Sequence, residues 1–193
     1  MSAVNSTMLP LGTRLPSFRL PDTTGKRVSP GDFTDRKALL VAVICNHCPY
    51  VKHIIDAFSA LVDEYAGKGV GVIAISANDV DAYPEDAPAR MAEFAADHRF
   101  TFPYLYDETQ AAAAALRAAC TPDFFLFDGE RKLFYRGRMD DASPGNDRPV
   151  TGVELRAALD ALLAGGTPPP TQKASIGCSI KWKAGREPAY VNA

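Results

Sequence analysis

Two cysteines separated by two residues, Cys45 and Cys48, are the side chains of this sequence best suited to chemistry. An apolar run, 38–45, leads into the pair and apolar residues at helical spacing follow it, so the pair falls on a strand-to-helix turn. The free N–H groups and partial positive charge of a helix N-terminus stabilise a thiolate, which lowers a cysteine pKa below ~8.5. A second thiol at this spacing can resolve a mixed disulfide. The pattern predicts a redox dithiol in which Cys45 is the exposed attacking thiol and Cys48, one helical turn deeper, attacks second.

The residues around the pair add to this prediction. His47 supplies a hydrogen-bond donor or partial positive charge near the thiolate, which should stabilise the reduced form and make the disulfide a better oxidant. Pro49 suits the first turn of a helix, where its missing N–H costs nothing. Asp79, after a second apolar segment at 70–76, is a candidate proton acceptor for the resolving cysteine. Its alternative role is that of a capping or loop acid.

Metal binding is the alternative chemistry for the same residues. Two cysteines at this spacing can form half of a zinc site. The second pair is missing here, because Cys120 and Cys178 stand alone in the sequence, but His47 and His53 could complete a Cys/His cluster. A copper or zinc binding module therefore remains open beside the redox dithiol, and stoichiometric metal in the purified protein would favour it.

The elements that position the pair alternate between strand and helix signals. A β-hairpin is predicted at the N-terminal side, then βαβ units, a second hairpin with a tight turn at 128–129, and a last helix that starts from a capping box at 151–154. We expect strands at 17–20, 26–28, 38–44, 70–76, 102–106, 124–127 and 133–136, and helices at 51–66, 89–98, 109–119 and 153–163. Residues 78–88 read as a loop. This order predicts an α/β fold, a central mixed sheet flanked by helices.

The domain organisation follows from where the pattern ends. We expect a single domain, 1–193, with its core at about 12–164. Gly165 and Gly166, followed by three prolines, end the last helix and begin an irregular tail, 165–193. Because the tail carries Cys178 and Trp182, we expect it to pack on the core.

Composition excludes several classes of function. The 193 residues include 21 Lys and Arg against 23 Asp and Glu, a net charge of −2, so we expect no nucleic-acid partner. No segment approaches the ~20 apolar residues that span a membrane, and the first residues lack the pattern of a secretory signal. We therefore expect a cytoplasmic protein with no membrane partner. Four cysteines are too few for a disulfide scaffold.

At these residues the chain resembles the thioredoxin-like superfamily, and within it the AhpC/TSA and TlpA-like redoxins. The resemblance rests on the strand at 38–44, the Cys45-Asn46-His47-Cys48 motif, the helix after it and the segment TPDFFLFD at 121–128, and it spans about 12–163. It implies a thioredoxin-like fold with an N-terminal hairpin extension, and a cis bond before Pro122. That proline would face the dithiol and present the backbone of Thr121 to a partner's sulfur. Thr121, Pro122 and His47 are thus the implied substrate-binding residues.

The chain also departs from the family's pattern. Ile44 stands where thioredoxin has Trp, and Ala42 stands three residues before Cys45, where the peroxiredoxin signature has Thr. The second departure weakens a peroxidase reading. Cys120 and Cys178 are each either an accessory redox thiol or a small buried side chain. We expect that Cys178, if redox-active, pairs with Cys120 or exchanges with Cys45.

These observations together predict a thiol–disulfide oxidoreductase. Cys45 attacks a protein or small-molecule disulfide, Cys48 resolves the mixed disulfide, and an electron-donor thiol system reduces the pair again. No cofactor and no metal are expected. A peroxiredoxin-like antioxidant peroxidase and a Cys/His metal-binding module are the alternatives. The oligomeric state, the substrate and the electron donor do not follow from the sequence.

Overall fold

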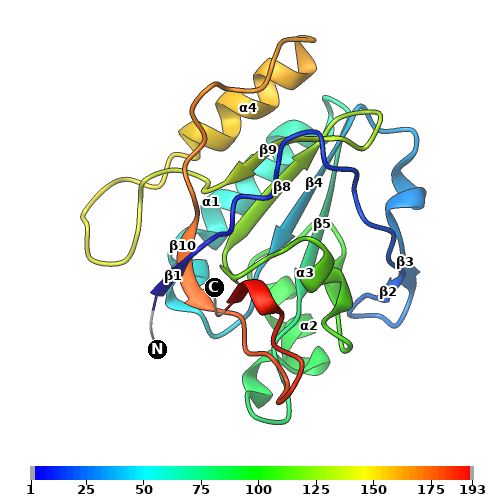
Figure 1. Cartoon of the computed structure of the whole chain (residues 1–193), viewed down its shortest axis with the longest axis vertical. Helices are drawn as coiled ribbons and strands as arrows, with labels where there is room; N and C mark the ends of the chain where they lie inside the picture. The colour runs from blue at the N-terminus through cyan, green and yellow to red at the C-terminus, as the bar shows by residue number, and fades with distance from the viewer. Residues whose placement is uncertain (1–2, 192–193) are drawn as a thin grey trace.

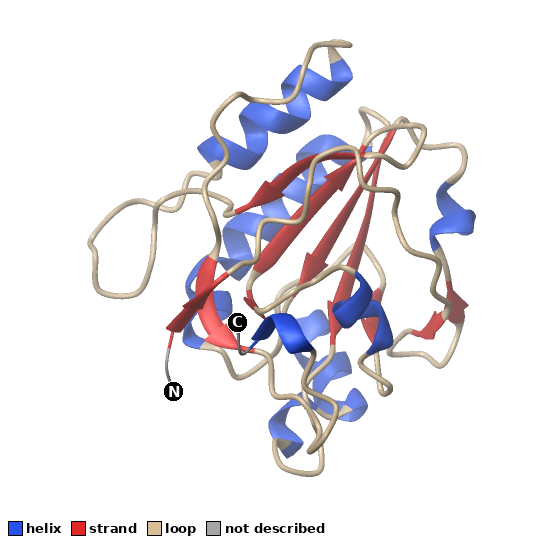
Figure 2. Cartoon of the chain, viewed as in Figure 1, coloured by secondary structure: helices blue, strands red, loops and turns tan. Residues whose placement is uncertain are grey.

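The computed structural model describes residues 3–191, which form an α/β fold around a five-stranded mixed sheet with the strand order β6-β5-β4-β8-β9 (Figures 1 and 2). Strands β4, β5 and β6 are parallel, β8 runs antiparallel to β4, and β9 runs antiparallel to β8. Every residue of β4 and β5 is buried, as expected for central strands covered on both faces. The strands are β4 (Ala38–Val43), β5 (Val70–Ser76), β6 (Tyr104–Tyr106), β8 (Asp123–Phe127) and β9 (Leu133–Gly137).

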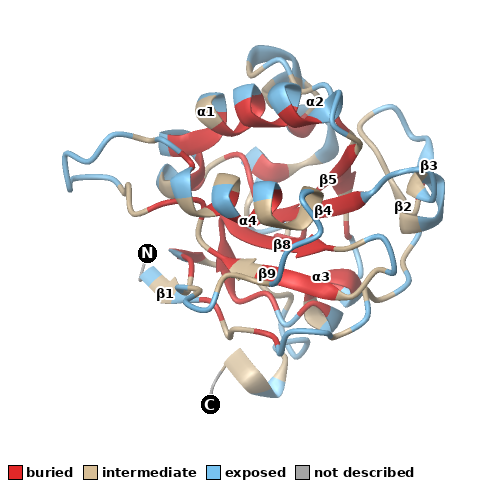
Figure 3. Ribbon diagram, turned by 90° about the horizontal axis from the view of Figure 1, so that it is seen from above, coloured by how far each residue is buried: buried red, intermediate tan, exposed pale blue. Residues whose placement is uncertain are grey.

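Helices cover both faces of this sheet (Figure 3). One core lies between the sheet and α1 (Pro49–Ala66), α2 (Pro88–Asp97) and α4 (Val153–Leu163). The other lies beneath α3 (Ala111–Ala115) and includes side chains of the N-terminal segment and the tail. The apolar positions of α1 recur at helical spacing and are buried, and the helix ends before Gly67, as predicted. Short 3-10 helices occupy Pro30–Phe33, Pro84–Asp86 and Ala189–Val191.

The tail enters a second, three-stranded sheet. β10 (Ile176–Ser179) lies between β1 (Ala3–Asn5) and β7 (Cys120–Thr121), antiparallel to both. Figure 1 shows the tail passing α4 and then lying beside β1, so an N-terminal and a C-terminal segment pair in one small sheet. The Thr121–Pro122 peptide bond between β7 and β8 is cis, as the family resemblance implied.

Three local predictions need correction. The Ala-rich helix is shorter than 109–119, because Arg117 adopts a positive φ of 53° and the chain then extends into β7. The capping box at 151–154 does not form: Glu154 pairs with Arg138, and the Asp140 carboxylate accepts the N–H groups of residues 151 and 152 instead. The turn after β8 takes residues 128–132 rather than two residues.

The predicted N-terminal hairpin is confirmed as β2 (Leu20–Pro21) and β3 (Arg27–Val28). The Asp22 carboxylate stabilises its turn by accepting the backbone N–H groups of Thr24 and Lys26. Strands β1, β7 and β10 were not predicted, so the expectation of an irregular tail is wrong at Ile176–Ser179. Among the described helices, none has the length and apolar character needed to cross a bilayer.

Candidate active site

The Cys45–Cys48 segment joins β4 to α1 at the carboxyl end of the central strand, where the sequence predicted it. Cys48 is the N-cap residue of α1, Pro49 begins the helix, and the carbonyl of Cys48 accepts the N–H of Lys52 at 3.0 Å. Cys48 is fully buried and Cys45 is 1% exposed, so the expectation that Cys45 is exposed is wrong. All four cysteines are free and buried.

Thr121 contacts both sulfurs of the pair. Its Oγ1 lies 3.4 Å from Cys45 Sγ, and its carbonyl oxygen accepts the Cys48 thiol proton at 3.1 Å. The cis bond to Pro122 thus lies at the dithiol, although more than seventy residues separate them in sequence. Thr121 and Pro122 are themselves buried, and Cys178 of β10 is the strand partner of Thr121. The backbone of Thr121, which the family resemblance implies binds a substrate sulfur, is therefore paired with β10 of the chain's own tail.

The two thiols of the pair share a hydrogen bond and titrate together. The hydrogen bond from Cys45, the largest contribution, acts together with hydrogen bonds from Thr121 and Cys178 to lower the pKa of Cys48 to about 5, against the effect of burial. The same contact with Cys48, together with burial, raises the pKa of Cys45 well above the usual value. The negative charge of the reduced pair therefore resides on Cys48, at the start of α1. The sequence had placed it on Cys45.

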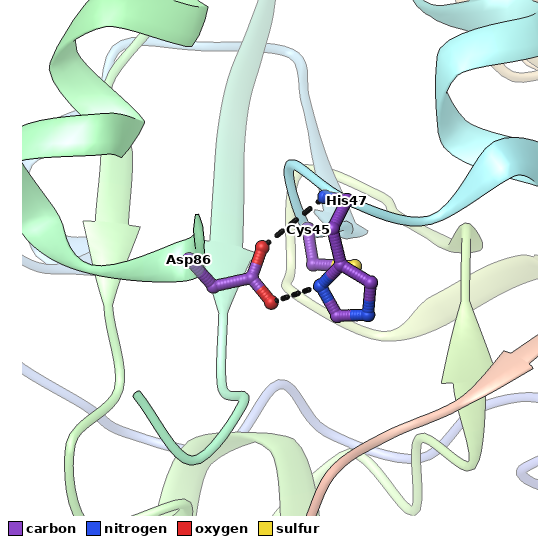
Figure 4. Close-up of side chains that lie close together, drawn as sticks. All are labelled: Cys45, His47 and Asp86. Carbon is purple, nitrogen blue, oxygen red and sulfur yellow. Dashed lines mark hydrogen bonds and ion pairs between the residues drawn. The ribbon is translucent and has the colours of Figure 1, made fainter. Parts of the chain in front are cut away.

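His47 is held by a buried acid, Asp86 (Figure 4). Asp86 Oδ2 lies 2.6 Å from His47 Nδ1, and Oδ1 accepts the backbone N–H groups of Asn46 at 2.8 Å and His47 at 3.3 Å. Asn78 donates a further hydrogen bond to Oδ2 at 2.7 Å, and the ring of Tyr83 stacks on the imidazole. One carboxylate thus fixes both the turn between the cysteines and the orientation of its histidine.

This network changes the protonation of both partners. The hydrogen bond to Asp86 raises the pKa of His47, against the effect of its partial burial. Burial raises the pKa of Asp86, but the hydrogen bonds from His47 and Asn78 more than offset it, so the net shift is downward. The pair therefore favours an imidazolium beside a carboxylate. The charge on Cys48 also raises the pKa of His47, so the charged histidine and the thiolate stabilise each other.

The sequence analysis did not identify Asp86. It considered Asp79, which is partly exposed and accepts the N–H of Asp81 in its own loop. Both acids lie in the segment 78–88, which has several carboxylates and no hydrophobic periodicity that would mark one of them as buried. The 3-10 helix Pro84–Asp86 brings the second acid under the dithiol turn.

Three of these groups also form a possible metal-ligand set. One ligand atom from each of Cys45, His47 and Asp86 lies within 4.8 Å of the others (Figure 4). The set includes neither Cys48 nor His53, and His53 is exposed on α1. His47 Nε2 is buried and has no hydrogen-bond partner among residues 3–191, so it is available as a ligand or donor.

The remaining cysteines lie in neighbouring strands but make different contacts. Cys178 acts on Cys48: its thiol helps to lower the pKa of Cys48, and Cys48 in turn raises the pKa of Cys178. Cys120 donates a long hydrogen bond, 3.8 Å, to the carbonyl of Pro122. Cys45 and Cys178 thus both lower the pKa of Cys48, whereas the Cys120 thiol bonds a backbone carbonyl instead.

The fold and the buried thiols define the class of protein as a thioredoxin-like redoxin. Residues 11–136 match the model of the AhpC/TSA family, so the chain belongs to that family. No curated protein matches the chain.

Three solved structures are similar to this chain. An uncharacterized conserved protein from Geobacillus kaustophilus is 50% identical with a TM-score of 0.93, over 95% of this chain and 98% of that one. A hypothetical protein from Sinorhizobium meliloti 1021 is 49% identical with a TM-score of 0.93, over 94% of this chain and 99% of that one. The thioredoxin domain of a thiol-disulfide oxidoreductase from Bacteroides vulgatus shares the fold at 15% identity and a TM-score of 0.58, over 78% and 99% of the two chains.

Proposed function

We propose that the protein is a thiol–disulfide oxidoreductase that uses Cys45 and Cys48 as its redox dithiol. The observation that carries this proposal is the pair of sulfurs at the start of α1, both in contact with Thr121 before the cis proline, where the pKa of Cys48 falls to about 5. Cys48 is therefore ionised at neutral pH, and a thiolate is the form of cysteine that exchanges with disulfides. Family membership and the shared fold agree with redox chemistry.

The reaction begins with a disulfide of a protein or small molecule. Cys45 passes its proton to Cys48 along their hydrogen bond and attacks one substrate sulfur, which breaks the substrate disulfide and releases the other sulfur as a thiolate. That thiolate takes up the proton from Cys48. Cys48 then attacks Cys45, forms the Cys45–Cys48 disulfide and releases the second substrate sulfur as a thiolate, which takes a proton from solvent. A thiol electron donor reverses these steps and restores the dithiol.

Catalysed reduction of insulin and of a small aromatic disulfide by dithiothreitol tests this proposal. We expect Cys45→Ser and Cys48→Ser each to abolish catalysis, and Cys120→Ser, a buried thiol outside the pair, to retain it. Cys48→Ser should trap the mixed disulfide on Cys45. Wild-type protein that reduces neither substrate would contradict the proposal. Consumption of hydrogen peroxide in the same assay, without disulfide reduction, would favour the peroxidase alternative.

Metal binding is a second candidate, favoured by the proximity of Cys45, His47 and Asp86. A thiolate, an imidazole and a carboxylate are all ligands of zinc. Against this role, the Asp86 carboxylate already accepts hydrogen bonds from Asn46, His47 and Asn78. Zinc titration of the reduced protein decides: stoichiometric binding lost in Cys45→Ser and Asp86→Asn but kept in Cys48→Ser would establish the metal site.

A further inference from the structure

We propose that Cys178 is a third redox thiol, which attacks Cys48 in the oxidised dithiol and forms a Cys48–Cys178 disulfide. The inference rests on the proposed Cys45–Cys48 disulfide and extends it into the C-terminal tail. Its starting point is β10, which brings a residue far along the sequence into the buried cluster that contains both cysteines of the pair.

Strand register determines where Cys178 points. Cys178 of β10 lies directly opposite Thr121 of β7, and Ser179 lies opposite Cys120. Side chains directly opposite one another in an antiparallel pair project to the same face, and successive side chains along a strand project to opposite faces. Since the Thr121 hydroxyl reaches Cys45 Sγ, the face that Thr121 and Cys178 share is the face of the dithiol. Cys120 is directed away from it.

Cys178 and Cys48 lie in the same buried cluster, on the face that Thr121 shares with Cys178. A hydrogen bond from the Cys178 thiol lowers the pKa of Cys48 and so helps to stabilise its thiolate. When protonated, the Cys48 thiol donates a hydrogen bond to the carbonyl of Thr121, the residue that faces Cys178 across the strand pair. Thr121 is thus a neighbour of both Cys48 and Cys178. Cys178 itself is 3% exposed, so neighbouring groups rather than solvent surround its sulfur.

Strand β10 packs closely enough against β7 to keep Cys178 in this position. A Cβ at Gly177 would lie 2.0 Å from the carbonyl oxygen of Thr121, so only glycine allows β10 this approach to β7. Backbone hydrogen bonds hold both sides of the strand: Ser6 donates to the carbonyl of Ser175, and Ile180 donates to the carbonyl of Ala119. Further along, the side chains of Asn78 and Gln110 accept the N–H groups of Lys181 and Lys183.

The exchange needs no reagent beyond the disulfide of the proposed function. The sulfur of Cys178 attacks Cys48, the Cys48–Cys178 bond forms, the Cys45–Cys48 bond breaks, and the proton of Cys178 passes to the leaving sulfur of Cys45. Oxidation state is conserved, because one disulfide replaces another. In the reduced protein, burial and the hydrogen bond to Cys48 raise the pKa of Cys178 to about 12. Once Cys48 is in a disulfide its negative charge is gone, and so is its effect on Cys178.

Peptide mapping without reduction tests the exchange. Trypsin cleaves after Lys37 and Lys52, so Cys45 and Cys48 share one peptide, whereas Cys178 lies in the peptide that ends at Lys181. Full-length protein is oxidised with limiting diamide, quenched in acid, alkylated and digested. In wild type we expect the internal disulfide of 38–52 together with a species that links 38–52 to 174–181. The linked species should increase as the pH of incubation rises, because ionisation of Cys178 drives the exchange.

Serine variants identify the sulfurs involved. Cys45→Ser should lose two of its three remaining thiols and yield the cross-linked peptide, and Cys45→Ser/Cys120→Ser should do the same. Cys45→Ser/Cys178→Ser should keep both of its thiols and serves as the matched control. If wild type forms the internal disulfide but neither it nor Cys45→Ser yields the cross-link, the exchange is overturned while the oxidoreductase stands. If wild type forms no internal disulfide under any condition, the proposed function itself fails.

Discussion

The Asp86 carboxylate lies beneath the turn that carries the dithiol, with Oδ2 2.6 Å from Nδ1 of His47. The acid is fully buried, so its charge is compensated by hydrogen bonds to the protein rather than by water. Through this pair, a residue of the loop after β5 raises the pKa of the histidine between Cys45 and Cys48.

Replacing Asp86 should lower the pKa of His47. In Asp86→Asn the hydrogen bond to a charged acceptor is lost, and the pKa of His47, which that bond raises, should fall. Titration of the imidazole by nuclear magnetic resonance measures the change. Asp56→Asn is the matched control, because Asp56 bonds a different histidine, His98, on the surface. An unchanged pKa of His47 in Asp86→Asn would contradict this role.

The same pair gives stability a defined pH dependence. Because the pKa of His47 is raised above 6.5 in the folded protein, its contribution is fully present below 6.5 and is lost as the pH rises through the folded value. Urea unfolding of wild type and Asp86→Asn across this range measures it. The difference in unfolding free energy between them should shrink as the pH rises past the pKa of His47. A constant difference would mean that Asp86 acts only through its bonds to Asn46 and Asn78.

The Cys48 thiolate should titrate at about 5, and this midpoint should depend on the Cys45 and Cys178 thiols. Loss of the hydrogen bond from Cys45, the largest contribution, should raise the pKa of Cys48 in Cys45→Ala more than loss of the bond from Cys178 does in Cys178→Ala. Thiolate absorbance in the ultraviolet, followed against pH, gives the midpoint. Cys120→Ala should leave it unchanged. If the low midpoint survives in Cys48→Ser, the charge resides on Cys45 instead.

The close packing of β10 against β7 should depend on Gly177. In Gly177→Ala the new methyl group would meet the carbonyl of Thr121 at 2.0 Å, so β10 must shift. Such overpacking costs about 1–3 kcal/mol of unfolding free energy. It should also speed alkylation of Cys178, which β10 carries. Gly67→Ala, where no atom lies within 4 Å of the new Cβ, is the control and should change neither quantity. Equal alkylation rates in both variants would show that β10 does not protect the thiols.

The strand–turn–helix unit of the site was predictable because its signals are local. The apolar run of β4, the spacing of apolar residues in α1 and Gly67 after it each act within a few residues. Strand β10, which packs beside the dithiol, was not predictable. Four residues form β10, and Gly177 among them argues against a strand when read alone. What stabilises β10 is pairing with β1 and β7, whose positions only the folded chain defines.

The distribution of charge in the site was misjudged for the same reason. A helix N-terminus favours a thiolate, and that local argument was applied to Cys45, the first cysteine. The structure places Cys48 at the N-cap and surrounds it with donors from Cys45, Thr121 and Cys178. Two of these three lie more than seventy residues away in sequence. Long-range contacts therefore decide which cysteine is ionised.

Asp123, the residue after the cis proline, should destabilise the protein at neutral pH. It is buried, neither carboxyl oxygen has a close hydrogen-bond partner among the described residues, and burial raises its pKa well above 3.8. For an acid with a raised pKa the stabilisation is fully present below 3.8 and is lost as the pH rises towards the folded value. Asp123→Asn, which imitates the neutral form, should gain about 1–3 kcal/mol of unfolding free energy at neutral pH and nothing below 3.8.

Asp35→Asn, at an exposed acid, should stay within about 0.5 kcal/mol of wild type at both pH values. Urea unfolding at the two pH values measures both variants, and a loss of stability in Asp123→Asn at neutral pH would mean that the folded protein relies on the charged carboxylate.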